Sequence, residues 1–99
     1  MGTSITSKQV KFLRQRCHHI KPIVTIGGAG LTENVMSEIE LALDHHELVK
    51  IKLSVDDRDA RKQLTDDICR HCQAELVQAI GKTISIYRLN PEKAIIALP

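Results

Sequence analysis

The chain is poor in aromatic residues and has no long apolar run. Its 99 residues include one Phe, one Tyr and no Trp, so Ile, Leu, Val and Ala must build the core. No segment approaches the roughly 18 apolar residues that a membrane-spanning helix needs. Residues 1–8 also lack the apolar stretch of a secretory signal peptide. We therefore expect residues 1–99 to form one domain in the cytoplasm, because this length supports a single hydrophobic core.

Cysteine is scarce, and the three residues of this type leave one without a disulfide partner. An odd number of cysteines suits a reducing compartment. The Cys-x-x-Cys at 69–72 and the Cys-His-His at 17–19 could supply zinc ligands, but structural zinc usually needs two ligand pairs and a second Cys-x-x-Cys is missing. Helical spacing instead places Cys17 and Cys72 on buried stripes, as small hydrophobes. We expect no metal and no cofactor.

Signals of enzymatic chemistry are also missing. Gly81, Lys82 and Thr83 resemble the end of a phosphate-binding P-loop, but Leu76 occupies the position of the required earlier glycine. No Ser stands with a His and a carboxylate in a recognisable nucleophile arrangement. The sequence therefore predicts a protein without catalytic activity.

Negative charge is absent from the first 32 residues. Five positive side chains lie there: Lys8, Lys11, Arg14, Arg16 and Lys21. Residues 33–47 reverse this pattern, with five acids and no Lys or Arg, although the net charge of the chain is only +2. This segregation predicts a dipolar surface of which one side attracts a polyanion. Two solvated helix faces of opposite sign are the simpler alternative.

Capping residues and helical spacing predict three helices. Thr6 opens a capping box before a helix over about residues 7–18. Thr32 caps a second helix, and Asp56 or Asp57 caps a third. The apolar positions expected to be buried are Val10, Leu13 and Cys17 in the first helix, Val35, Ile39, Ala42, Leu43 and His46 in the second, and Ala60, Leu64, Ile68 and Cys72 in the third.

Apolar runs and alternation predict four strands, at residues 23–26, 48–54, 76–80 and 83–88. Gly81 and Lys82 join the last two strands as a tight hairpin. The order α-β-α-β-α-β-β predicts an α/β fold with a mixed four-stranded sheet, because strands separated by helices favour parallel pairing. Helices gathered on one face would leave Lys50 and Lys52 open to solvent. Residues 95–98 either add a strand or pack as a tail.

A Gly-x-x-Gly loop at residues 27–30 is the most informative feature. It joins a short β-branched run to a helix start, and it contains three of the five glycines. A backbone without side chains can turn sharply and lets a ligand approach its N–H groups. KH-type modules clamp an RNA backbone with this element, whereas a strand-to-helix turn without a ligand is the alternative. Glu33 already neutralises the positive N-terminal end of the second helix. We therefore expect a phosphate between the loop and the side chains of Lys8 and Lys11, and not on the helix axis.

Three blocks of sequence, at residues 26–32, 38–52 and 80–88, together resemble the YhbY-like CRM (chloroplast RNA splicing and ribosome maturation) domain family. The resemblance extends from about Thr6 to Leu98. It implies a fold similar to the C-terminal domain of bacterial translation initiation factor three. It also implies an RNA-binding protein that associates with precursors of the large (50S) ribosomal subunit and assists their assembly.

The resemblance further implies that the glycine loop touches the RNA backbone. Its central pair lacks the basic or hydrogen-bonding side chain that members of the family often have, so charge must come from neighbours. The residues expected to contact RNA are Gly27, Gly28, Ala29, Gly30, Lys8, Lys11, Arg14, Lys21, Lys82 and Arg88. Phe12 is expected either to stack on an unpaired base or to cover a neighbouring loop or terminus. Tyr87 is expected either to stack on a base or to lie at a hydrated edge, where its hydroxyl group meets water.

The expected partner is therefore RNA, with no DNA and no membrane, bound by a monomer. The alternative function is a protein-interaction module, in which the acidic second helix docks a basic ribosomal or assembly protein. Exchanging the charges of that helix would separate the two hypotheses.

Overall fold

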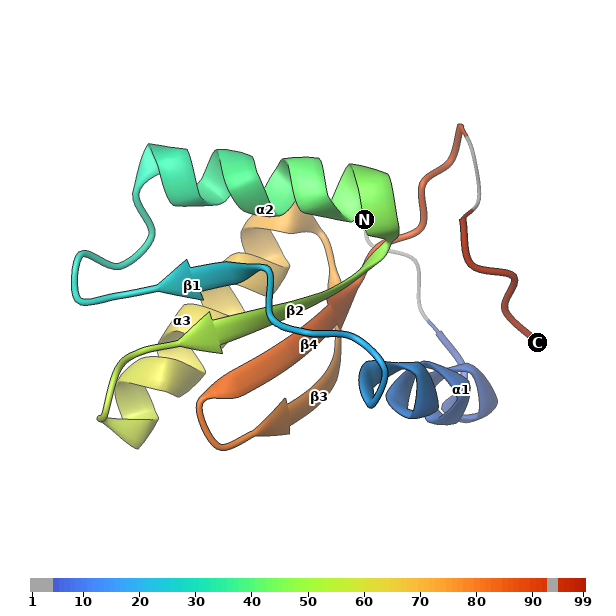
Figure 1. The fold of residues 1–99 in the computed structure, drawn as a ribbon, viewed down its shortest axis with the longest axis horizontal. Helices are drawn as coiled ribbons and strands as arrows, with labels where there is room; N and C mark the ends of the chain where they lie inside the picture. Colours follow the sequence, from blue (N-terminus) through green and yellow to red (C-terminus); the bar gives the residue numbers. More distant parts are fainter. Residues whose placement is uncertain (1–4, 93–94) are drawn as a thin grey trace.

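The computed structural model describes residues 5–92 and 95–99. Its elements follow the predicted order: α1 (Ser7–Cys17), β1 (Val24–Ile26), α2 (Glu33–His46), β2 (Leu48–Leu53), α3 (Arg58–Cys72), β3 (Glu75–Ile80) and β4 (Thr83–Tyr87). Residues 95–99 contain no strand and pack as a tail, which decides between the two alternatives for this segment. The α/β architecture predicted from the sequence is thus confirmed (Figure 1).

The four strands form one mixed sheet in the order β1-β2-β4-β3. β1 runs parallel to β2, with α2 as the crossover, whereas β4 is antiparallel to both β2 and β3. β1 is shorter than predicted, because Ile23 lies outside it and is 53% exposed. The β3–β4 hairpin turns at Gly81, whose φ of +57° suits glycine.

Side chains of the predicted capping residues begin all three helices. The Thr6 side chain accepts a hydrogen bond from the amide of Gln9. The Gln9 side chain in turn accepts one from the amide of Thr6, which completes the capping box. Thr32 accepts from the amide of Val35, and Asp57 from that of Ala60. These local contacts satisfy N–H groups that a helix start leaves without partners, and so they fix where each helix begins.

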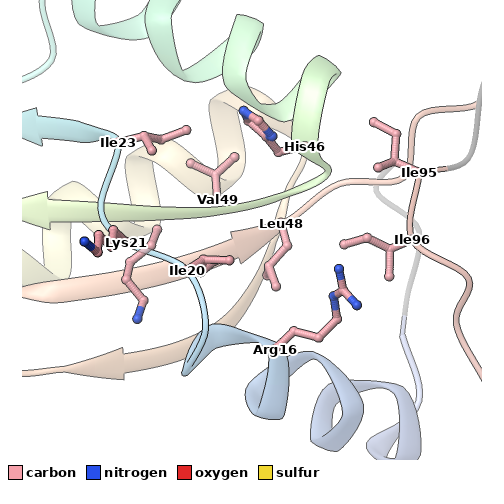
Figure 2. A pocket seen from close by; sticks show the side chains of 10 residues that line it. Arg16, Ile20, Lys21, Ile23, His46, Leu48, Val49, Ile95 and Ile96 are labelled. Atoms are coloured by element: carbon pink, nitrogen blue, oxygen red, sulfur yellow. The ribbon is translucent and has the colours of Figure 1, made fainter.

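The larger hydrophobic core lies between one face of the sheet and the helices α2 and α3. Its buried members are Val24, Ile26, Ile39, Ala42, Leu43, Val49, Ile51, Leu53, Ile68, Cys72, Ala74, Ile84 and Ile86. Of the predicted stripes, Val10, Val35, Ala60 and Leu64 are half-buried. His46 is exposed, contrary to prediction, because its side chain faces an open hollow beside β2 (Figure 2).

A second core forms on the opposite face of the sheet, under α1 and the C-terminal tail. It joins Leu13 and Cys17 of α1 to Leu48, Val77, Tyr87 and Ile96. Successive residues of a strand point to opposite faces, so Leu48 and Tyr87 present apolar side chains away from α2 and α3. The helices are therefore not gathered on one face, the arrangement that would have left Lys50 and Lys52 open, because these residues also need cover.

The position of α1 changes the surroundings of the two strand lysines. Lys52 is exposed, as predicted. Lys50 is half-buried, and its Nζ donates a hydrogen bond of 2.6 Å to the carbonyl oxygen of Cys17 at the end of α1. Lys50 is therefore not open to solvent, because its positive charge interacts with the negative C-terminal end of α1.

A buried carboxylate anchors the C-terminal tail. Glu47, directly after α2, has no exposed surface and a φ of 62°. Its Oε2 accepts from the amide of Asn90 at 2.7 Å, and its Oε1 accepts from the amides of Ile95 and Ile96 at 2.9 and 2.6 Å. Its own carbonyl oxygen accepts from the amide of Arg88. One side chain thus joins the end of α2 to the segment that follows β4.

We expect Glu47→Ala to lower the free energy of unfolding by about 3 kcal/mol. The substitution leaves buried amides without acceptors, and hydrogen bonds to charged groups are each worth about 1.5–3 kcal/mol. Urea denaturation measures the loss. Glu38→Ala, which removes an exposed acid of α2, serves as the control and should change stability by less than about 0.5 kcal/mol. Equal midpoints for the two variants would contradict the anchoring role.

Candidate nucleic-acid interface

The glycine loop is a tight turn at the carboxyl end of β1. The amide of Gly30 donates to the carbonyl oxygen of Gly27 at 3.0 Å, which places Gly28 and Ala29 at the exposed centre of the turn. Gly30 has a φ of +73°, a backbone conformation that favours glycine. A Cβ atom at Gly27 or Gly28 would meet nothing within 4 Å.

Gly28 and Gly30 are therefore glycines for different reasons. Gly30 is required by the shape of the turn, whereas nothing in the fold itself excludes a side chain at Gly28. The amides of Gly28 and Ala29 donate no hydrogen bond within residues 5–92 and 95–99. Exposed N–H groups with open space around them can donate hydrogen bonds to an anionic ligand at close range.

The ends of β1, β2 and the β3–β4 hairpin meet beside this loop. Thr25 pairs with Lys52 in the sheet, and the amide of Ser54 donates to the carbonyl oxygen of Ile26. The amide of Leu53 donates to the carbonyl oxygen of Lys82. The structure therefore brings Lys52 and Lys82 to the same end of the sheet as the loop.

Lys82 already has an anionic neighbour. Its Nζ forms a salt bridge with the carboxylate of Asp56, and this hydrogen bond and positive charge lower the pKa of Asp56. Both side chains are well exposed, and exposed pairs of this kind contribute little to stability. Lys82 can therefore exchange this partner for a phosphate at small cost.

The remaining cations lie farther from the loop. α1, which carries Lys8, Lys11 and Arg14, is at the opposite end of the molecule from the turn that follows β1 (Figure 1). Lys21 is exposed in the segment between them. The prediction that one phosphate sits between the loop and the α1 lysines is therefore wrong, because α1 packs against Leu48 and Tyr87, the far ends of β2 and β4.

Two of the predicted contact residues are occupied within the fold. Arg88 forms salt bridges of 2.7 Å with Glu40 and 2.9 Å with Asp44, and it also donates to the carbonyl oxygen of Cys72. Arg14 is exposed, but its Nε donates to the carbonyl oxygen of Val77 at 3.0 Å. Arg88 thus connects β4 to α2 and α3, and the structure does not bring it to the loop.

The two aromatic rings do not form a stacking platform in this structure. Tyr87 is 2% exposed beneath α1, and burial followed by the charge of Glu47 raises the pKa of its hydroxyl. Phe12 is half-buried and packs against the second core. For Phe12 this is the alternative given above, the covering of neighbouring structure. The alternative for Tyr87, a position at a hydrated edge, is wrong, because its ring is buried beneath α1.

A basic surface that sequence reasoning found only in part extends along one side of the molecule. α1, β1, β2 and β4 contain no Asp or Glu. We define the basic face as the cations of α1, the segment after it and the outward side of β2: Lys8, Lys11, Arg14, Arg16, Lys21, Lys50 and Lys52. The acids of α2 and α3 lie on the other side of the sheet. The alternation around Lys50 and Lys52 indicated that these lysines point to the outward side of β2. No signal in the sequence indicated that α1 packs on the same side.

The thiols of α3 are poor nucleophiles and poor ligands. Burial raises the pKa of Cys69 to about 11 and that of Cys72 to about 12, with the carboxylate of Glu40 as a further cause for Cys72. Thiolate is the reactive and metal-binding form. Across the described ranges, no group of three His, Cys, Asp or Glu residues is arranged to hold a metal ion.

These features define a small α/β domain with a glycine turn at the strand ends and cations on one side of its sheet. The CRS1 / YhbY (CRM) domain model matches residues 5–88, and the chain belongs to this family. Within the described part of the chain, no helix has the length and apolar character needed to cross a membrane.

Two bacterial proteins of similar length are relatives of this chain. A Haemophilus influenzae protein named as an RNA-binding protein is 44% identical over 97 residues, which cover 98% of this chain and 97% of the relative. A Pseudomonas aeruginosa protein named as a probable RNA-binding protein is 43% identical over 89 residues, covering 90% and 86%. The solution structure of SAV1595 from Staphylococcus aureus, described as a candidate RNA-binding protein, has a TM-score of 0.82 and 38% identity, and covers 97% and 100% of the two chains.

We expect the loop glycines to respond differently to alanine. Gly30→Ala should lower the free energy of unfolding by about 1 kcal/mol, because its φ of +73° strains a residue with a Cβ atom. Gly28→Ala should leave stability within about 0.5 kcal/mol of wild type, since the added Cβ meets open space. Thermal and urea denaturation of both variants compare these effects, and a larger loss for Gly28→Ala would contradict the described turn.

Proposed function

We propose that this protein binds RNA through its basic face and its glycine loop. The observation that carries the proposal is the separation of charge in space: α1 packs on the face of the sheet opposite α2 and α3, and neither α1 nor the strands β1, β2 and β4 contain an acid. A polyanion is attracted to such a side and repelled by the acidic helix α2. The names of the Haemophilus and Pseudomonas relatives support RNA as that polyanion.

The loop and the sheet lysines form the first part of the proposed contact. The amides of Gly28 and Ala29 approach a phosphate directly, while Lys52 and Lys82 supply positive charge at the same end of the sheet. Contacts of this type hold the sugar-phosphate backbone and set its direction, but they do not read sequence.

α1 forms the second part. From Lys52 to Leu48, which packs under α1, β2 spans four residue steps, or about 13 Å at 3.3 Å per residue. The loop and the cations of α1 are therefore too far apart to share one phosphate. They suit a longer stretch of backbone, with Lys21 between the two parts.

We further infer that the RNA belongs to precursors of the large ribosomal subunit. This finer assignment rests on the CRM resemblance given above. In this proposal the protein acts as a cytoplasmic monomer without a catalytic step. It holds a segment of ribosomal RNA until other assembly events replace it.

The acidic surface of α2 gives less support to a protein-docking function. Arg88 pairs with both Glu40 and Asp44, so these two acids already have a structural role. Removing their charges would disturb the contact between α2 and β4 as well as any partner. We therefore favour RNA binding.

Lys52→Ala should weaken binding to single-stranded RNA and reduce its dependence on salt. Loss of one phosphate contact lowers the slope of log affinity against log salt by about 0.7. Fluorescence anisotropy with a labelled decauridylate, measured over a range of KCl concentrations, gives this slope. Lys62→Ala, which removes an equally exposed lysine from α3, is the matched control. Equal slopes for the two variants would contradict the position of the interface.

Gly28→Asp should release the protein from ribosomal particles while leaving it folded. The Cβ position is open, so the new carboxylate repels phosphate without disturbing the turn. Sedimentation of cell extracts followed by immunoblotting measures the distribution, with wild type expected in fractions of large-subunit size. Gly28→Ala is the control. Wild-type protein found only at the top of the gradient would exclude the ribosomal assignment but not RNA binding.

A further inference from the structure

A hollow of about 330 Å³ opens beside the first half of β2, where no strand covers its edge. The segment after α1, the end of α2 and the C-terminal tail surround it (Figure 2). Ile23 and Ile95 lie at opposite sides of the hollow, with Ile20 and Leu48 between them. Ile23 is 53% exposed and Ile95 is 45% exposed, so the lining of the hollow presents apolar surface to water.

Positively charged side chains also line the hollow. They are Arg16, Lys21 and Lys50, and among the described residues that line the hollow none carries a carboxylate. All three cations belong to the basic face, so the hollow is part of that surface. The ligand that this combination recognises has a flat or compact apolar part and negative charge next to it.

A nucleotide of single-stranded RNA has this chemistry. Unstacked bases bind proteins by packing on aromatic or apolar side chains, with phosphates held by nearby cations. Tyr87 lies within the second core and Phe12 packs against it, so this hollow offers the base an apolar surface that the aromatic rings do not. The volume lies at the low end for ligand sites and suits one nucleoside better than a partner helix.

We propose that this hollow receives one unpaired base of the bound RNA, with Arg16 and Lys21 holding the adjoining phosphates. The inference rests on the proposed function and adds a base-binding position to it. The base packs between Ile23 and Ile95 and shields both side chains from water. Binding then depends on the presence of a base, and not only on the phosphate backbone.

The test compares decauridylate with an abasic oligomer of ten ribose phosphates. Wild type should bind decauridylate at least about fivefold more tightly, which corresponds to a base contact of about 1 kcal/mol. In the double variant Ile23→Ala, Ile95→Ala this ratio should fall close to one, while affinity for the abasic oligomer stays unchanged. Leu41→Ala, which truncates an equally exposed side chain on α2, should keep the wild-type ratio.

Methyl NMR spectra of the wild-type protein give a second readout that does not depend on a variant. The Ile23 and Ile95 methyl resonances should shift with decauridylate, through the ring current of the base, and stay in place with the abasic oligomer. Equal affinity for both oligomers, or a ratio that survives in the double variant, would overturn the assignment of the hollow and leave RNA binding intact. Failure of both oligomers to bind would overturn the proposed function itself.

A protein partner is the competing occupant. Equal affinity for the two oligomers, combined with methyl shifts on addition of an acidic leucine-containing peptide, would assign the hollow to that class and overturn the base-binding proposal.

Discussion

The carboxylate of Glu47 joins the two halves of this molecule. The larger core lies between α2, α3 and the sheet, whereas the smaller one lies between the opposite face, α1 and the tail. Glu47 ends α2, and its oxygens hold the amides of Asn90, Ile95 and Ile96. Burying a charge is costly unless hydrogen bonds compensate it. These amides provide that compensation, so the path of the tail, and with it one wall of the hollow beside β2, follows from this one side chain.

Local signals predicted most of the fold. Thr6, Thr32 and Asp57 cap the helices that the sequence assigned to them, because capping depends on residues three positions apart. The alternation in β2 predicted its two faces for the same reason. The side on which α1 docks could not be predicted, since it depends on apolar residues of β3, β4 and the tail. Glu47 resembled the solvated acids before it, because nothing within a few residues of it indicates the amides it binds.

The candidate interface was predictable to a similar extent. The sequence located the glycine turn and the hairpin lysine, and pairing of β1, β2 and β4 brings them to one end of the sheet. It could not show that Arg88 pairs with Glu40 and Asp44, which precede it by 48 and 44 residues. Nor could it show that the Tyr87 ring lies beneath α1. Each of these residues has the right chemistry for RNA, and only long-range packing decides whether that chemistry is available.

The docking of α1 has a consequence for how the chain acquires its structure during synthesis. Arg14 bonds to Val77, 63 residues later, and Gln9 bonds to Pro99, 90 residues later. Translation proceeds from the N-terminus, so α1 can contact Leu48 and Lys50 of β2 early but lacks its partners in β3, β4 and the tail until those segments have emerged. A helix of 11 residues is marginally stable alone in water. The docking of α1 is thus completed only after residues up to 90 positions later have been made, and this docking completes the cationic surface.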